Sequence, residues 1–310
     1  MAKSKTILVV VDPTSREQPA LARAVWLAGK LGLELELFVC DYDQYLAGER
    51  FFDSKALKKA RAGLMERHTA RLEKLAQPVR EQGLAVTVDV AWDRPLHEGI
   101  LRKIDKAKPR LVAKDTHYHS AIRRSVFSNT DWNVIRKCPV PLWLVKPHQD
   151  VSITTLLAAV DPMHERDKPA RLDHKILKMA GEFSAAFGAR LVAVHAFDPA
   201  PVYAVSTDAM SFPITEPINE AVAALREQHQ AAMQKLTARH GIEAGNAHVI
   251  EGETREVLVG AVDEFEADLV LIGAVSRGAL KRLALGSTAE RVLDFIPCDL
   301  LIVKPDSPKL

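Results

Sequence analysis

A glycine-rich segment near the end of the chain, Gly273 to Thr288, contains the residues best suited to chemistry. It reads GAVSRGALKRLALGST and follows an apolar run. Glycine adopts positive φ angles without a Cβ penalty, so such a loop can turn tightly and aim backbone N–H groups at a ligand. If a helix starts at Gly286, then Gly286, Ser287 and Thr288 offer unpaired N–H donors and hydroxyls, and the helix dipole favours an anion. The segment predicts a phosphate-binding loop, with a plain helix cap as the alternative reading.

The aligned segment of the first half, Asp115 to Thr130, lacks these features. It reads DTHYHSAIRRSVFSNT and contains no glycine. Asp115 stands where the second half has Gly273. A carboxylate there would repel a phosphate, and the missing glycines remove the freedom of the turn. We therefore expect the first half to bind no phosphate-bearing ligand.

Other reactive side chains give weaker signals. Asp115, His117 and His119 are of the types that bind a metal or relay a proton, but no further ligand stands in an obvious place, so we expect solvated loop histidines. His195 is expected to be a packed or hydrogen-bonded residue. The sequence contains no G-x-S-x-G, H-E-x-x-H or G-x-x-x-x-G-K-S motif, so we assign no catalytic residue and no metal ligand and do not expect a dedicated hydrolase.

The bulk composition is that of a globular protein. Of 310 residues, 47% are hydrophobic and 26% are charged, and the formal net charge is only +2. Such a small excess of positive charge argues against a nucleic-acid partner. The apolar run after the basic start is shorter than a signal-peptide core, and no apolar stretch reaches 18 residues. We expect a cytoplasmic protein without membrane insertion.

The sequence contains an internal repeat. ILVVVDP (Ile7–Pro13) matches LLAAVDP (Leu156–Pro162), and VPLWLVKP (Val140–Pro147) matches CDLLIVKP (Cys298–Pro305). A chain of this length suits two domains, and a short polar linker follows Pro147. We therefore predict a first domain at residues 1–147 and a second domain at residues 153–310. The three cysteines are too few and too widely spaced for a disulfide framework, so each is expected to be a small buried hydrophobe.

Each copy shows the same alternation of apolar strands with amphipathic helices. Strands that are apolar along their whole length and alternate with helices indicate a parallel sheet covered on both faces, and right-handed crossovers make it doubly wound. The fold class is therefore α/β, with two tandem five-stranded parallel sheets. In the second copy we expect strands at residues 155–160, 190–197, 246–252, 268–274 and 299–305, and helices at residues 170–188, 216–241, 253–267 and 287–296.

The strand order places a candidate site. If the order is 3-2-1-4-5, a ligand crevice lies beyond the carboxyl ends of strands one and four, where the winding reverses. Strand one of the second copy delivers Asp161 and Pro162 to that edge, and strand four delivers Gly273.

These motifs resemble the universal stress protein family in its tandem-domain form. The resemblance rests on the "VDP" ends of strand one, the terminal "LLIVKP" and the glycine signature, and it covers nearly all of both halves. It implies an adenine nucleotide alpha hydrolase-like fold with strand order 3-2-1-4-5. The ATP-binding branch of that family carries Gly, two residues, Gly, nine residues, then Gly-Ser or Gly-Thr. The corresponding residues in this sequence are Gly273, Ser276, Gly286 and Ser287.

The resemblance also implies roles for single residues. Asp161, followed by Pro162, would lie near the nucleoside, the backbone of Ala196 would meet the adenine edge, and the segment from Gly273 to Thr288 would hold the phosphates. Ser276 departs from the family pattern. Either Gly278 takes over the turn or the pocket narrows and triphosphate binding weakens.

The function that this resemblance implies is that of a cytoplasmic stress-response protein, a ligand-sensing or binding module. We expect ATP or another adenine nucleotide in the second domain, with Mg²⁺ as an associated ion, and none in the first domain. The alternatives are a carrier of an apolar, lipid-like molecule, a partner-binding scaffold without nucleotide, and a slow ATPase. Family dimers pair their last strands, so we expect the two domains to form an intramolecular pseudo-dimer, with a homodimer of chains as a further option.

Overall fold

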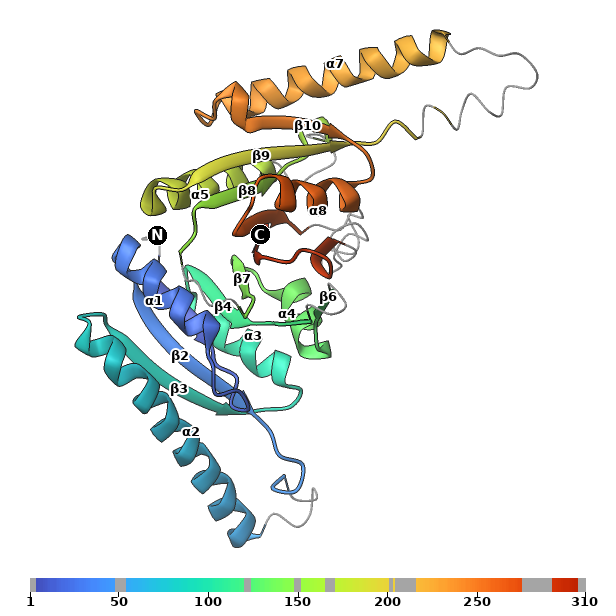
Figure 1. The fold of residues 1–310 in the computed structure, drawn as a ribbon. Coiled ribbons are helices and arrows are strands. Elements are labelled where there is room, and N and C mark those ends of the chain that lie inside the picture. The colour runs from blue at the N-terminus through green and yellow to red at the C-terminus, as the bar shows by residue number, and fades with distance from the viewer. Residues whose placement is uncertain are drawn as a thin grey trace. The chain divides into compact units, whose positions relative to one another are not determined.

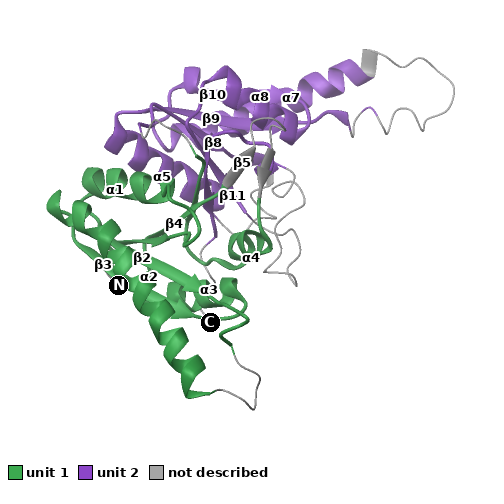
Figure 2. Ribbon diagram, turned by 60° about the horizontal axis from the view of Figure 1, so that its bottom comes forward, with its two compact units in different colours: residues 1–119, 126–151 green, residues 120–125, 152–310 purple. Residues whose placement is uncertain are grey.

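A computed structural model describes residues 4–47, 54–119, 124–147, 152–164, 171–200, 203, 216–274 and 292–305 of the chain. The chain divides into two compact units, one of residues 1–119 with 126–151 and the other of residues 120–125 with 152–310 (Figure 2).

The first unit is built on a parallel sheet of five strands in the order β3-β2-β1-β4-β7 (Figure 1). Helix α3 lies next to α4, and α1 packs on β1 and β4. The elements are β1 (Thr6–Val10), α1 (Pro19–Leu31), β2 (Glu34–Asp41), α2 (Lys55–Glu81), β3 (Val86–Trp92), α3 (Leu96–Ala107), β4 (Leu111–Asp115), β5 (His117–His119), β6 (Arg124–Val126), α4 (Asn129–Lys137) and β7 (Leu142–Val145).

The second unit repeats this architecture with the order β10-β9-β8-β11-β12, again all parallel. Its long helix α7 packs on β10 and β9. The elements are β8 (Thr155–Ala159), the 3-10 helix η2 (Pro162–His164), α5 (Leu172–Phe187), β9 (Arg190–Phe197), α7 (Glu216–Ala238), the 3-10 helix η3 (Ala244–Asn246), β10 (Ala247–Glu251), α8 (Thr254–Glu264), β11 (Leu269–Gly273) and β12 (Asp299–Val303).

Strand register is the same in both units. Ile7 of β1 faces Leu111 of β4, and Leu156 of β8 faces Leu269 of β11, its counterpart in the repeat. In chain order, both sheets read 3-2-1-4-5. The α/β class, the tandem repeat and this strand order are therefore confirmed.

Burial explains why these segments form strands and helices. All five residues of β12 are buried, as a strand covered on both faces requires. The apolar stripe of α5, which includes Ile176, Ala180 and Phe183, is buried, and the helix ends at Gly188 with φ of 67°. Glycine suits that left-handed position because it has no Cβ.

The three cysteines are buried, as expected. Burial, with Asp93 as the next cause, raises the pKa of the Cys40 thiol to about 12. That thiol is therefore inert at neutral pH.

The secondary structure differs from the sequence-based expectation near His117 and His119. The loop expected around His117 and His119 contains strand β5, which forms a two-stranded sheet with β6. The first half of the helix expected at residues 287–296, residues 287–291, lies outside the described residues. No helix in the described ranges is both long enough and apolar enough to cross a bilayer.

Candidate ligand-binding site

The candidate site of the second unit lies at the carboxyl edge of its sheet. Ala159 of β8 faces both Val194 of β9 and Ile272 of β11. The residues that follow these positions therefore emerge at one edge. The structure brings Asp161, Ala196 and Gly273 to that edge, and Pro162 begins η2 directly behind Asp161.

Asp161 is held at the edge through its backbone. Its N–H donates to the Oδ1 atom of Asp173 over 3.3 Å. Asp173 is buried in the first turn of α5, where the helix dipole favours a carboxylate. The Asp161 carboxylate keeps 29% of its side-chain surface exposed, and its Oδ1 lies 3.9 Å from Nδ1 of His195. Asp161 therefore offers a partly exposed acceptor at the end of β8.

His195 is buried and hydrogen-bonded, as expected from the sequence. Its side chain sits at the end of β9, with Nδ1 3.2 Å from the carbonyl oxygen of Val160. Its Nε2 lies 2.7 Å from Nδ1 of His229 on α7, and the Phe197 ring lies 4.7 Å from the His229 ring.

Sequence reasoning missed His229. The available signal was its place on the apolar stripe of α7, because Met233, four residues further on, is buried against the unit. A histidine at such a position faces the sheet and needs a polar partner there.

Ala196 is half-buried and faces Ile250 of β10. It lies one residue before the end of β9, next to His195, so its backbone belongs to the same sheet edge as Asp161.

Gly273 is a glycine for a different reason from the one expected. Its φ is not positive, so it makes no left-handed turn. A Cβ atom at Gly273 would lie 2.7 Å from Cδ2 of Leu172 and 3.2 Å from Cδ1 of Ile176. The missing side chain lets α5 pack closely on the end of β11, and the expected tight turn at this first glycine is wrong. The other predicted site residues, Ser276, Gly278, Gly286, Ser287 and Thr288, lie outside the described residues.

The same strand position in the first unit carries a carboxylate. Strand register equates Asp115 with Gly273. The Asp115 side chain is buried, and its Oδ1 accepts a hydrogen bond of 2.5 Å from the backbone N–H of Ala20. Ala20 is the second residue of α1, where N–H groups have no partner within the helix. The carboxylate therefore occupies the N-terminal end of α1, a position that the helix dipole makes favourable for an anion.

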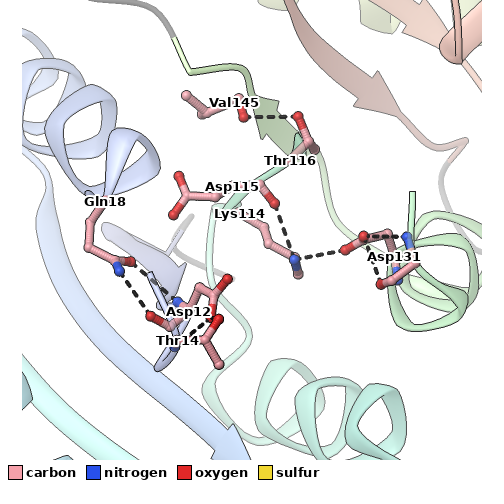
Figure 3. A network of polar contacts seen from close by, with 9 residues as sticks. Asp12, Thr14, Gln18, Lys114, Asp115, Thr116, Asp131 and Val145 are labelled. Atoms are coloured by element: carbon pink, nitrogen blue, oxygen red, sulfur yellow. Dashed lines mark hydrogen bonds and ion pairs between the residues drawn. The ribbon is translucent and has the colours of Figure 1, made fainter. Parts of the chain in front are cut away.

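A second carboxylate occupies the start of α4 (Figure 3). Ser128 and Asp131 form a capping box: the Ser128 hydroxyl accepts from the Asp131 N–H over 3.1 Å, and Asp131 Oδ2 accepts from the Ser128 N–H over 2.8 Å. Asp131 is 3% exposed, and its Oδ1 lies 2.7 Å from Nζ of Lys114. Both helix starts at this edge of the first unit thus carry a carboxylate from the chain itself.

Asp12, the counterpart of Asp161, is tied into a turn (Figure 3). Its Oδ1 accepts from the N–H and the hydroxyl of Thr14 over 2.7 and 2.6 Å, and its N–H donates to Oε1 of Gln18 over 3.2 Å. The second unit has Met163 in the place of Thr14, which cannot make the hydroxyl bond. The two aspartates therefore share a position and differ in their partners.

Across the part of the chain that the structure describes, no group of three or more His, Cys, Asp or Glu side chains could hold a metal ion.

Comparison with known proteins finds one family twice along the chain. The model of the family described as "Universal stress protein family" matches residues 3–146 and 155–304. "Universal stress protein E" of Escherichia coli K12 is 31% identical over 308 residues, which cover 99% of this chain and 96% of that protein. Its namesake from Photorhabdus laumondii is 30% identical over 306 residues, with the same coverage.

Solved structures agree with these sequence matches. A putative universal stress protein from Pseudomonas aeruginosa UCBPP-PA14 superposes with a TM-score of 0.73 at 26% identity, covering 98% of this chain and 94% of that one. A universal stress protein from Archaeoglobus fulgidus gives a TM-score of 0.66 at 16% identity, covering 98% of this chain and all of the other, which supports the fold alone.

Proposed function

Since the chain belongs to the universal stress protein family and carries two tandem copies of its domain, we propose that it is a stress-response binding protein whose second half binds an adenine nucleotide such as ATP. The first half binds none. The nucleoside end lies near Asp161 and Ala196, and the phosphates lie against the segment that begins at Gly273.

The observation that carries this proposal is a difference between the two units at equivalent strand positions. The first unit has Asp115 there, and the second unit has Gly273. In the first unit, the carboxylates of Asp115 and Asp131 take the two helix starts that a phosphate would need. An incoming phosphate would have to displace charge-assisted hydrogen bonds and would be repelled by both carboxylates. At Gly273 the second unit has no side chain to place a charge there.

Asp161 supports the same assignment. Its carboxylate is partly exposed at the edge, so it can accept from hydroxyl or amino groups of a nucleoside. The chain then continues into the glycine signature, where Gly286, Ser287 and Thr288 would receive the phosphates. Mg²⁺ would enter with the triphosphate, since Mg²⁺ is commonly bound through substrate phosphates.

The wider assignments follow from the family. We propose a cytoplasmic protein with domains at residues 1–147 and 153–310, in which the last strands of the two domains pair as a pseudo-dimer. The proposed role is binding, and slow ATP hydrolysis is the alternative, which would need a placed water and a metal. A lipid-like ligand and a scaffold without nucleotide are outcomes that the tests below separate from nucleotide binding.

Equilibrium dialysis with ATP and Mg²⁺ tests the proposal on a matched pair of variants. Gly286→Asp places a carboxylate at the predicted phosphate site, whereas Ser128→Asp changes the counterpart in the first half and keeps a good helix cap. We expect Gly286→Asp to abolish ATP binding and Ser128→Asp to leave it unchanged.

Equal ATP binding by both variants would contradict the proposal. Mass spectrometry of denatured wild-type protein gives an independent reading. Release of an adenine nucleotide supports the proposal, whereas release of a fatty molecule would favour a carrier of a lipid-like ligand.

A further inference from the structure

The long helix α7 packs on β10 and β9, and two pairs of histidines add polar contacts between its middle and C-terminal end and the rest of the unit. His229 in the helix lies 2.7 Å, nitrogen to nitrogen, from His195 of β9. His240, two residues after the end of the helix, has its Nε2 2.8 Å from Nδ1 of His174 on α5. The two contacts are eleven residues apart along the chain, so they tie both the middle and the end of α7.

A hydrogen bond between two imidazole rings tolerates only one extra proton. One nitrogen must carry a hydrogen and the other must present a lone pair. An imidazolium and a neutral imidazole satisfy this rule, but two imidazolium rings do not, because both facing nitrogens then carry N–H groups and both rings are positive. Acid therefore breaks each contact at its second protonation.

The first pair has little room to adapt. His195 is 3% exposed, and its ring meets that of His229 edge to edge, with a centroid distance of 5.0 Å and an angle of 13° between the ring planes. Nδ1 of His195 faces the carbonyl oxygen of Val160. A second charge would be buried at this edge-to-edge contact, where desolvation is costly.

The second pair shows the same tendency. Burial lowers the pKa of His240, and the neighbouring His174 and Arg239 lower it further. The rings lie 5.1 Å apart at 36°. His240 therefore resists protonation while the contact is formed.

Charged groups around α7 come from each element that it contacts. Asp161, just before η2, lies 3.9 Å from His195 and is the acidic neighbour of the first pair. On β10, Glu251 pairs with Arg226 of α7, and the ring of His248 packs on Phe265. The remaining groups are Arg239 beside His240 and Lys175 on α5, which donates to the carbonyl oxygen of Lys304.

The first unit provides the natural comparison. Its helix α2 carries His68, whose Nε2 lies 2.8 Å from Oδ2 of Asp41 at the end of β2. A carboxylate accepts a hydrogen bond from neutral or protonated histidine, and protonation adds an ion pair. Arg71 of α2 also donates to the carbonyl oxygens of Pro13 and Ser15. This contact of α2 therefore does not require a neutral histidine, unlike a bond between two imidazole rings.

We propose that the two histidine pairs make the docking of α7 in the second unit pH-sensitive, so that mild acid loosens α7 while α2 stays in place. The sign follows from linkage: a histidine whose pKa is lower in the docked state stabilises that state fully above its undocked pKa, about 6.5. The stabilisation decreases as the pH falls from that value toward the docked pKa.

Hydrogen exchange of the full-length chain at pH 7.5 and pH 5.5, corrected for intrinsic exchange rates, tests the proposal. We expect the protection of peptides from residues 216–240 to fall several-fold at pH 5.5, where a histidine with the undocked pKa of about 6.5 is about nine-tenths protonated. Peptides from residues 55–81 should keep their protection. Equal protection of the 216–240 peptides at both pH values would overturn the proposal.

Two variants separate this device from a general loss of stability. His229→Gln with His240→Gln keeps donors and acceptors but cannot titrate, so the pH dependence of the 216–240 peptides should disappear. His68→Gln is the matched control and should leave it unchanged. A double variant that loses protection at pH 5.5 as much as wild type would contradict the proposal. If the double variant is unfolded at pH 7.5, the histidine signals of the wild type settle the question by NMR: a low-pH titration of His240 supports the proposal and an ordinary one overturns it.

Discussion

The ends of the fourth strands, Asp115 and Gly273, show how one fold position can serve two purposes. In the first unit, α1 begins at Pro19, so the N–H of Ala20 lies in the first turn and a buried carboxylate binds it. In the second unit, α5 lies so close to the end of β11 that Leu172 and Ile176 leave no room for a side chain at Gly273. The difference teaches that the packing of the neighbouring helix decides whether the end of the fourth strand can carry a buried carboxylate.

The largest effect should come from making the second unit like the first. Gly273→Asp would push a carboxylate against Leu172 and Ile176 of α5. The backbone N–H of Ile176 is already bonded within the helix, so it cannot donate to that carboxylate. We expect the second unit to lose about 4 kcal/mol from overpacking and an unpaired buried charge, measured by urea denaturation. Adding Leu172→Ala should recover part of the loss. A fully stable Gly273→Asp protein would show that the close packing is not as described.

Removing the carboxylate at the start of α4 should have the next largest effect. Asp131→Ala deletes the capping box and leaves Lys114 without this partner. We expect a loss of about 3 kcal/mol in urea denaturation of the first unit, because breaking a mostly buried ion pair is costly. Ser128→Ala, which removes the hydroxyl alone, should cost about 1 kcal/mol. Equal stability of the two variants would mean that the charge of Asp131 contributes nothing to the stability of the first unit.

These comparisons also show what the sequence could and could not predict. The repeat, the strands and the order 3-2-1-4-5 followed from apolar runs at constant spacing, because burial on both faces of a parallel sheet imposes that pattern. The contacts of Asp115 with Ala20 and of His195 with His229 could not be read, because each joins residues far apart in the chain. Close packing against α5 explains why residue 273 is a glycine, and this could not be predicted without knowing where α5 lies.

A smaller effect isolates the charge of Asp115. Asp115→Asn keeps an acceptor of the same shape for Ala20 but removes the negative charge from the start of α1. We expect the first unit to lose about 1 kcal/mol, the usual scale of a helix-dipole interaction, measured as a shift in the urea midpoint. An unchanged midpoint would mean that the carboxylate is not stabilising the helix as an anion.

The smallest effect should come from the turn at Asp12. Thr14→Val removes one hydroxyl bond to an exposed carboxylate while the N–H bond remains. We expect a loss of about 0.5 kcal/mol, since exposed hydrogen bonds contribute little. Met163→Thr is the reciprocal change and should be close to neutral. A loss above about 2 kcal/mol for Thr14→Val would show that this turn organises the whole edge.

Photolabelling with 8-azido-ATP, followed by peptide mapping, tests most directly whether the two halves differ in ligand chemistry. The account predicts labelled peptides from residues 153–310 alone, with protection by unlabelled ATP. Specific labelling of residues 1–147, or of both halves equally, would contradict it.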